Sequence, residues 1–228
     1  TLPDTVIDLG SSWEVNLESL AMLKPDLILS TPYLDDLRPK LETMAPVLRL
    51  DVFSPDAGPS LAAAIVATRW LGTAIGRDAE AERFLAESDA FFEICRQRLG
   101  GRTWPPLAFI NFMDDRHARI YGSPGLFHSV LERLGLSNAW TEPSNFWGFQ
   151  TISIEELSRV TDPRARLVAL EPVPGDVLPK LAESALWQRL PFAQPGHFFT
   201  LPATLMFGMV NEARRFAGLI TDMLVLEA

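Results

Sequence analysis

A loop–helix–strand unit occurs twice in this chain of 228 residues, once near each end. In the first copy, Trp13 precedes a helical pattern that starts after Asn16 and a short apolar run. In the second copy, Trp147 precedes a helical pattern that starts at Ser153 and another apolar run. Asn and Ser are favoured helix N-caps, and the acids that follow them suit the positive end of the helix dipole. The repeat predicts two similar lobes that face each other, each with an aromatic loop.

Short apolar runs alternate with amphipathic ones along the whole chain, which is typical of α/β proteins with parallel strands. The expected strands are Val6 to Leu9, Leu27 to Ser30, Val47 to Leu50, Leu107 to Phe112, Ala118 to Tyr121, Leu167 to Leu170 and His197 to Leu201. The expected helices follow Asn16 and Asp36, start at the capping residue Ser60, and cover Asp78 to Leu99, Leu126 to Leu134, Ser153 to Val160, Val177 to Trp187 and Met209 to Leu226.

The helical pattern from Asp78 to Leu99 is long enough to link two lobes, because a helix of about 20 residues spans about 30 Å. It predicts a rigid connection with limited opening and closing. The expected division is an N-terminal lobe at residues 1–77, an interdomain helix at 78–101 and a C-terminal lobe at 102–228. Apolar sequence begins almost at once, at Val6. We therefore expect the first strand and any export signal to lie upstream of Thr1.

Charge and hydropathy limit the possible partners. The chain has 20 Lys and Arg against 29 Asp and Glu, a net charge of −9, and 47% hydrophobic residues. Such a chain can bury a sizeable core, but the charge argues against binding to nucleic acid or to an anionic membrane surface, which require clustered cations. No apolar run approaches the roughly 20 residues that a membrane span needs. The ligand is expected to be neutral, cationic or small.

Signatures of catalysis and of metal binding are missing from the sequence. There is no phosphate loop, no nucleophile elbow and no His or Cys pair at metal-ligand spacing. The one cysteine, Cys95, lies on an apolar helical stripe and is interpreted as a buried core residue without a disulfide partner. His117, His128 and His197 are scattered singly over different elements. We expect no zinc or iron site made from protein side chains.

One polar cluster, Asp114 to His117, lies between two expected strands. It is interpreted as a charged turn, because nothing else marks a nucleophile and its base. The alternative is an α/β enzyme that uses Asp114, Asp115 or His117.

Aromatic residues outside periodic segments are the more unusual feature. The stretch from Asn145 to Gln150 is expected to be a loop, so its rings are not explained by a core stripe. Rings and amides on loops are a common way to bind a neutral organic ligand. Trp147, Trp13 and Tyr33, which follows an expected strand in a loop broken by Pro32, are therefore candidate ligand contacts. The remaining tryptophans are interpreted as packing residues: Trp70, Trp104, Trp140 and Trp187.

Several stretches together resemble one protein family. They are Asp8-Leu9-Gly10, Asn16-Leu17-Glu18, Lys24-Pro25-Asp26, Tyr121 to Phe127, Asn138-Ala139-Trp140, Asn145 to Gly148, Ser153-Ile154-Glu155, Leu186-Trp187-Gln188 and Pro191-Phe192. In these motifs the chain resembles, over nearly its whole length, the ferrichrome-binding iron-hydroxamate receptors. Those receptors are class III substrate-binding proteins of ABC importers.

The resemblance implies an α/β protein of two similar lobes joined by one long rigid helix, with no catalytic activity. Such a protein is a monomer that binds an iron(III) siderophore in a shallow aromatic cleft and delivers it to the permease dimer of an ABC importer. It works in the periplasm or, as the alternative, from a lipid anchor on the outer face of the cytoplasmic membrane. Because the iron arrives inside the siderophore, the resemblance implies no cofactor and no metal ligands from the protein.

The resemblance also assigns site residues by position. Tyr33 matches a tyrosine that meets the hydroxamate groups, and Trp147 matches a cleft tryptophan. The residues expected to bind the ligand are Ser12, Trp13, Tyr33, Asn145, Trp147, Phe149, Leu205 and Phe207.

The chain departs from the family pattern in two places. Ser12 and Trp13 stand in the loop where the family has an arginine that holds the negatively charged iron–oxygen centre. The family's aromatic pair after the last strand falls on Leu205 and Phe207, so one ring is lost. We therefore expect a cargo that differs from ferrichrome itself, with the change in specificity centred on the first copy of the repeated unit.

The family docks on its permease through one acidic residue on each lobe. Glu155 matches the acid of the second lobe, and Asp36 is assigned to the first. An alternative for the cargo keeps the same fold but replaces the siderophore with haem or a cobalamin, because flat aromatic clefts also suit macrocycles.

Overall fold

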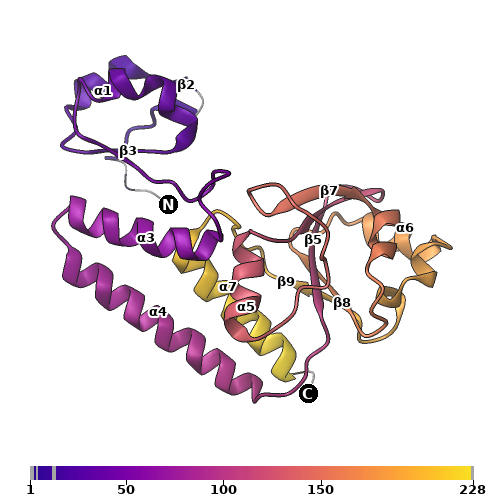
Figure 1. Cartoon of the computed structure of the whole chain (residues 1–228). Coiled ribbons are helices and arrows are strands. Elements are labelled where there is room, and N and C mark those ends of the chain that lie inside the picture. Colours follow the sequence, from indigo (N-terminus) through magenta and orange to yellow (C-terminus); the bar gives the residue numbers. More distant parts are fainter. Residues whose placement is uncertain (1–2, 4, 12–13, 227–228) are drawn as a thin grey trace.

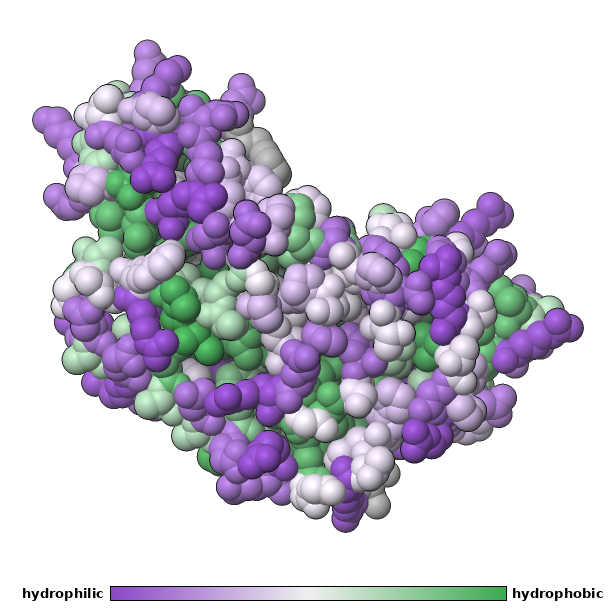
Figure 2. All heavy atoms as spheres, in the orientation of Figure 1, coloured by the Kyte–Doolittle hydropathy of each residue, from purple (hydrophilic) through white to green (hydrophobic). Residues whose placement is uncertain are grey.

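The structure is a computed structural model that describes residues 3, 5–11 and 14–226. It consists of a small unit, residues 5–11 and 14–51, and a large unit, residues 52–226. The small unit lies beside helix α3 (Ser60–Ala74), and the long helix α4 (Asp78–Leu99) runs along the outer side of the large unit (Figure 1). Figure 2 shows a broad notch between the two units.

The small unit contains two separate pairs of short strands. Its elements are β1 (Gly10–Ser11), β2 (Glu14–Val15), α1 (Leu17–Leu23), β3 (Ile28–Ser30), the 3-10 helix η1 (Pro32–Leu37), α2 (Arg38–Leu41) and β4 (Val47–Arg49). Strands β1 and β2 pair antiparallel, whereas β3 and β4 pair parallel. A small core of Leu20, Ile28, Leu41 and Ala45 lies beneath α1 and α2. The parallel pair agrees with the expected α/β architecture.

The expected strand from Val6 to Leu9 is wrong. These residues form no ladder within the described part of the chain, and the side chains of Val6 and Ile7 are 52% and 55% exposed. A short apolar run becomes a strand only where a neighbouring strand satisfies its backbone groups. Here the pairing starts later, at Gly10, whose N–H donates to Asp8 Oδ1 at 2.8 Å.

A five-stranded sheet forms the centre of the large unit. Its strands are β5 (Leu107–Phe112), β6 (His117–Tyr121), β7 (Phe149–Ser153), β8 (Arg166–Leu170) and β9 (Phe198–Leu201), in the order β7-β6-β5-β8-β9. Strand β5 pairs parallel with β8, and β8 with β9, but β6 pairs antiparallel with β5 and with β7. The sheet is therefore mixed, because the tight turn between β5 and β6 can join only antiparallel neighbours.

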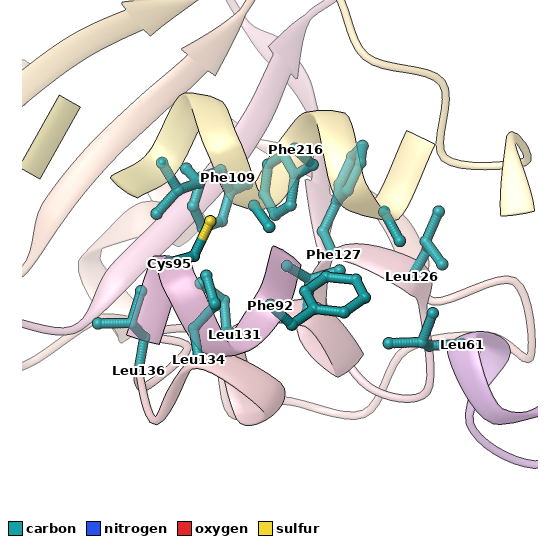
Figure 3. Packing of buried hydrophobic residues seen from close by; sticks show 14 of the residues in the cluster. Leu61, Phe92, Cys95, Phe109, Leu126, Phe127, Leu131, Leu134, Leu136 and Phe216 are labelled. Carbon is teal, nitrogen blue, oxygen red and sulfur yellow. The ribbon is translucent and has the colours of Figure 1, made fainter. Parts of the chain in front are cut away.

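Both faces of this sheet are covered, as the alternation of side chains along its strands requires. Phe109 and Tyr121 point to one face, where α3, α4, α5 (Leu126–Leu134) and α7 (Met209–Leu226) pack. Figure 3 shows Phe109, Phe127, Phe216 and Cys95 meeting in this cluster. The opposite face, with Ile110, is covered by shorter segments: η2 (Ile154–Arg159), α6 (Val177–Glu183), η3 (Trp187–Arg189) and η4 (Pro191–Ala193).

The long helices follow their expected bounds closely, but three details of the expectation are wrong. Ser60 is not a cap: it is the first residue of α3, and its hydroxyl donates to the carbonyl oxygen of Pro124 at 3.1 Å. The helix expected to reach Trp187 ends at Glu183, because Ser184 turns extended and its hydroxyl accepts the N–H of Trp187. The helix expected from Ser153 is a 3-10 helix of six residues.

The tryptophans also divide differently from the expectation. Trp140 and Trp187 are buried and Trp104 packs against the main core, but Trp70 on α3 is 50% exposed and is not a core residue. Cys95 is buried, as expected, and burial raises the pKa of its thiol. Within the described residues, no helix has both the length and the apolar composition that crossing a bilayer requires.

Candidate functional site

A cavity of about 400 Å³ lies between the two units. Its lining contains four aromatic side chains, together with three aliphatic or thioether side chains and one threonine. The residues are Thr31, Tyr33 and Leu50 from the small unit, and Val52, Phe53, Trp147, Phe207 and Met209 from the large unit. Tyr33, Trp147 and Phe207 were expected from the sequence to bind the ligand, and the structure brings these three together although they are far apart in the chain.

Tyr33 lies just after the carboxyl end of β3, where open α/β sheets bind their ligands. It was expected in a loop, but Pro32 starts a 3-10 helix and Tyr33 is part of it. Proline suits the first turn of a helix because its missing N–H would have no partner there. The tyrosine side chain is 39% exposed and faces the cavity.

Trp147 is held on the opposite wall by a tightly packed loop. Asn145 Oδ1 accepts the N–H groups of Trp147 and Phe149 at 3.1 and 3.2 Å. Gly148 has a φ of 81°, and a Cβ there would lie 2.0 Å from Gly125 Cα, so only glycine fits. Asn145 thus organises the loop that presents the indole, and Phe149 is the first residue of β7 rather than part of a loop.

The two walls touch through Tyr33 and Trp147. The indole N–H of Trp147 donates a hydrogen bond to the Tyr33 hydroxyl, and the ring centroids are 6.4 Å apart. A direct bond between side chains of the two units shows that their polar atoms converge on one point of the cavity.

The remaining wall comes from two connecting segments. Phe53, which follows β4, packs edge-to-face on Phe207, which precedes α7, with ring centroids 4.8 Å apart and an interplanar angle of 88°. Phe207 lines the cavity, but Leu205 does not and is 67% exposed. Of the two residues that match the family's aromatic pair, only Phe207 lines the cavity.

Behind Trp147 the aromatic wall continues into the large unit. Trp147 and Phe149 stack nearly parallel, with centroids 5.8 Å apart and planes at 13°. The guanidinium of Arg119, on β6, lies over the other ring of this stack at 4.3 Å from the Phe149 centroid. Aromatic faces attract cations in this geometry.

No lining residue carries a charge, and no histidine is among them. A cation of the small unit, Arg49, precedes the lining residue Leu50 and is paired with Asp35 and Asp51 at 2.8 Å each. Hydrogen bonds to Asp35 and Asp51 raise the pKa of Arg49. The polar side-chain atoms of the lining are therefore few: the Thr31 hydroxyl, and the Tyr33 hydroxyl and Trp147 indole N–H, which are bonded to each other.

Other expected site residues lie elsewhere. Ser12 and Trp13 lie outside the described residues. Asp36 is exposed in η1, and Glu155 is exposed near the start of η2. Neither carboxylate has an ion-pair partner within residues 3, 5–11 and 14–226, whereas the neighbours Asp35 and Glu156 are paired with Arg49 and Arg159.

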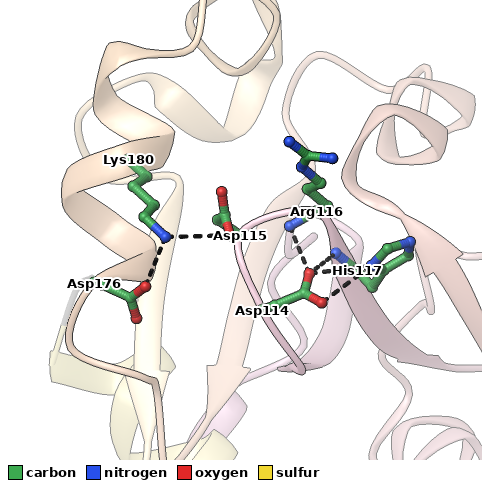
Figure 4. A network of polar contacts seen from close by, with 6 residues as sticks. All are labelled: Asp114, Asp115, Arg116, His117, Asp176 and Lys180. Atoms are coloured by element: carbon green, nitrogen blue, oxygen red, sulfur yellow. Dashed lines mark hydrogen bonds and ion pairs between the residues drawn. The ribbon is translucent and has the colours of Figure 1, made fainter.

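The polar cluster at the β5–β6 connection is a charged turn, as expected (Figure 4). Asp114 Oδ1 accepts the N–H groups of Arg116 and His117 at 2.7 and 2.6 Å. The Arg116 N–H and the His117 ring lower the pKa of Asp114. Asp115 instead points to Lys180 on α6, with Nζ and Oδ1 3.4 Å apart.

A second hollow, of about 440 Å³, runs beside this turn and is lined by Asp115, Arg116, His117, Lys180 and Glu155 among others. None of the three residues of the enzyme hypothesis, Asp114, Asp115 and His117, lines the cavity between the units. Among the residues that the structure describes, no group of three or more His, Cys, Asp or Glu could hold a metal ion.

Five of the lining residues were not expected from the sequence: Thr31, Leu50, Val52, Phe53 and Met209. The rule that pointed to Tyr33 could also have found Phe53, because both follow a strand of the parallel pair β3–β4. Met209 carried no such signal, since it starts a helix that is otherwise a core element.

A sequence profile described as "Periplasmic binding protein" matches residues 1–205. The iron(3+)-hydroxamate-binding protein FhuD of Escherichia coli is 29% identical over 223 residues, which cover 97% of this chain and 73% of that protein.

Solved structures show the same similarity. A siderophore-binding protein FhuD from Vibrio cholerae, solved with Fe3+–Desferal, has a TM-score of 0.86 and 30% identity and covers 100% of this chain and 85% of its own. A petrobactin-binding protein from Bacillus subtilis has a TM-score of 0.74 at 16% identity, covering 97% of this chain and 78% of its own, which shows a shared fold alone.

Proposed function

The chain belongs to the periplasmic binding protein family and has its class III fold with one long helix, and we propose that it captures an iron(III) siderophore of the hydroxamate type. The observation that carries this proposal is the cavity between the units, whose walls meet at Tyr33 and Trp147. The names of its relatives in E. coli and V. cholerae point to the same cargo.

The chemistry of the cavity suits such a cargo. A ferric siderophore brings its own iron ligands, so the protein needs to supply shape, apolar contact and a few hydrogen bonds. Aromatic rings provide large contact area at low entropic cost. When a ligand oxygen displaces the hydrogen bond between Trp147 and Tyr33, the indole N–H and the Tyr33 hydroxyl can bond to the ligand instead. Pockets for small molecules commonly combine an apolar wall with a few such groups. In this proposal the protein catalyses no reaction.

We further propose that the loaded protein, as a monomer, delivers the siderophore to the permease dimer of an ABC importer. Asp36 on the small unit and Glu155 on the large unit are the proposed contacts, supported by their exposure and by the lack of a described ion-pair partner for either. Surface ion pairs of this kind govern orientation more than affinity. The protein would work in the periplasm or from a lipid anchor on the outer face of the cytoplasmic membrane.

The division of the chain at residues 77 and 101 stays a prediction, in which helix α4 joins the lobes rigidly. With 22 residues, α4 has the expected length, about 33 Å at the rise of an α-helix. It packs against α3, α5 and α7, and α3 shares its core cluster with α5 and α7. In the predicted division α3 belongs to the N-terminal lobe, so its contacts with α5 and α7 of the C-terminal lobe support limited closure around a ligand.

Titration with ferric siderophores tests the proposal. We expect ferric desferrioxamine B to quench the tryptophan fluorescence of the purified protein with saturation at micromolar concentration or below, since Trp147 lines the cavity. Iron-free desferrioxamine B, haem and cobalamin serve as comparison ligands. No saturable response to any ferric siderophore would refute the proposal, and a saturable response to haem or cobalamin alone would favour the macrocycle alternative.

Docking has its own test. In a reconstituted importer, Glu155→Gln and Asp36→Asn are expected to slow uptake while the Kd for the ferric siderophore stays the same. Glu87, an acid on the exposed surface of α4, provides the matched control as Glu87→Gln. Uptake by all three variants at the wild-type rate would count against these two residues as permease contacts.

A further inference from the structure

The connecting segment, residues 50–59, leads from β4 of the small unit to α3 and is fixed to the large unit. Near its start, Phe53 packs edge-to-face on Phe207, with ring centroids 4.8 Å apart. Just after its end, the N–H and the hydroxyl of the buried Ser60 both donate to the carbonyl oxygen of Pro124, at 3.0 and 3.1 Å. Closely packed groups that are bonded in this way have little room to move. The connecting segment is therefore a firm support beside the cavity.

Arg49, the last residue of β4, ties η1 to this support. Its Nη1 donates to Asp51 Oδ2 at 2.8 Å. Its Nε donates to both carboxylate oxygens of Asp35, at 2.8 and 3.1 Å. Asp51 belongs to the connecting segment and Asp35 to η1, so one guanidinium bridges two separate elements. The planar fork of arginine fixes the relative position of two carboxylates, which the single ammonium of a lysine does less well.

This bridge is more shielded than an ordinary surface ion pair. The side chains of Arg49 and Asp51 are 28% and 27% exposed, whereas those of the Arg38–Glu42 pair in the same unit are 45% and 48% exposed. Shielded pairs are screened less by solvent and salt. Within the described residues, Arg49 is the one cation paired with either carboxylate of the bridge. Without it, two neighbouring carboxylates would repel each other, one of them partly buried.

The bridge affects the cavity through Tyr33, which lies two residues before Asp35 in η1. None of the six residues of η1 is buried, so packing holds this helix only weakly. The internal hydrogen bonds of a 3-10 helix also have poorer geometry than those of an α-helix. The orientation of Tyr33 toward Trp147 therefore depends on how η1 is tied to its surroundings.

We propose that Arg49 is a positioning residue for ligand binding: it holds η1 against the connecting segment, so that the Tyr33 ring faces Trp147 before a ligand enters. This inference rests on the proposed function, and it adds a residue outside the cavity lining that sets the geometry of the small-unit wall. Such preorganisation raises affinity, because the wall loses less conformational freedom when the ligand binds.

One test of this role needs no ligand. In the NMR spectrum of the free protein, the indole N–H signal of Trp147, assigned with Trp147→Phe, reports the hydrogen bond to Tyr33. Tyr33→Phe marks the position of this signal when the bond is absent. Arg49→Met removes the guanidinium, and we expect the signal to move toward that position. Arg38→Met is the matched control, because Arg38 pairs with Glu42 four residues on and does not reach the connecting segment. It should leave the signal unchanged.

Binding gives a second test. Arg49→Met is expected to raise the Kd for ferric desferrioxamine B about three- to ten-fold, as for the ordering of one more side chain. Arg49→Lys can pair with either carboxylate but lacks the fork, so its Kd should be intermediate. If Arg49 acts through Tyr33, the two substitutions are not additive, and in a Tyr33→Ala background Arg49→Met should change the Kd less than about two-fold. Asp35→Asn weakens the same bridge and carries both tests where Arg49→Met does not fold.

The outcomes separate this proposal from the proposed function. An unchanged indole signal in Arg49→Met overturns the role of Arg49 and leaves the proposed function intact. Losses of Arg49→Met and Tyr33→Ala that add fully have the same meaning. If the wild type binds no ferric siderophore, the proposed function fails and with it the role of Arg49 in binding, while the indole signal still decides whether Arg49 positions Tyr33.

Discussion

In the first loop–helix–strand unit, Asn16 caps α1 by accepting the N–H of Ser19 at 3.0 Å, and strand β3 has β4 as its one neighbour in the described chain. In the second unit, Glu156 accepts the N–H of Ser153 at 2.9 Å, and β8 lies between two other strands of a five-stranded sheet. Similar local sequence thus sits in a small unit with a small core and in a large unit with an extensive one. The second copy of the repeat, in the large unit, provides a rigid wall for a ligand. The first copy, in the small unit, provides a less constrained wall.

The difference is sharpest at the glycines of the two loops. A Cβ on Gly148 would meet Gly125 Cα at 2.0 Å, whereas a Cβ on Gly10, in the first unit, would find Glu14 O at 3.2 Å. Both neighbours are backbone atoms, but only at Gly148 would the Cβ lie far inside contact distance. The loop that presents Trp147 is therefore the more constrained of the two.

The largest expected effect follows from this contact. Gly148→Ala should destabilise the protein by about 3 kcal/mol or more, because it combines overpacking with a left-handed φ. Gly135→Ala, also left-handed but with nothing within 4 Å of its Cβ, is the matched control and should cost about 1 kcal/mol. Urea unfolding of both variants checks this. Equal losses would show that the Trp147 loop is no more tightly held than an open turn.

Removing the indole tests the wall itself. Trp147→Ala is expected to weaken binding of ferric desferrioxamine B by about 2–3 kcal/mol, roughly 30- to 150-fold in Kd. Trp70→Ala provides the control, since Trp70 is also half-exposed but lies on α3 and does not line the cavity. Isothermal titration calorimetry measures both variants. A weaker effect at position 147 than at position 70 would move the site away from the cavity.

Tyr33→Phe tests the cavity wall that the small unit contributes. It removes the hydroxyl that accepts the Trp147 N–H and keeps the ring. We expect a loss of about 1 kcal/mol in ligand binding, roughly five-fold in Kd. The same titration reports it, and a loss as large as that of Trp147→Ala would show that the two walls contribute equally.

The helix starts give the smallest effect and compare the two units directly. Asn16→Ala and Glu156→Ala should each cost about 1 kcal/mol locally. In the small unit this loss should appear as faster hydrogen exchange of α1 and β3 amides, with little change in global unfolding, because weakly supported segments open locally. Exchange that rises equally throughout the large unit in Asn16→Ala would contradict this distinction.

Long periodic elements could be predicted from the sequence, whereas contacts between distant segments could not. Helix α4 starts at Asp78 and ends at Leu99 as the pattern indicated, since a repeating apolar stripe and a terminal glycine are local signals. The error at Val6 to Leu9 has the opposite origin, because whether a short apolar run pairs depends on a neighbour elsewhere in the chain.

The same limit applies to the candidate site. Tyr33 and Trp147 could be found because each stands beside a recognisable local element, while Leu50, Val52 and Met209 became wall residues only through the packing of the two units. Trp70 shows the converse: a tryptophan on a helical pattern proved half-exposed.

The location of the iron tests the central claim most directly. A crystal grown with ferric desferrioxamine B and measured at the iron absorption edge gives the position of the metal without reference to any side chain. The iron should lie between the two units, beside Tyr33 and Trp147. An iron peak in the polar hollow of Asp115, Lys180 and Glu155, or none ordered between the units, would contradict this account.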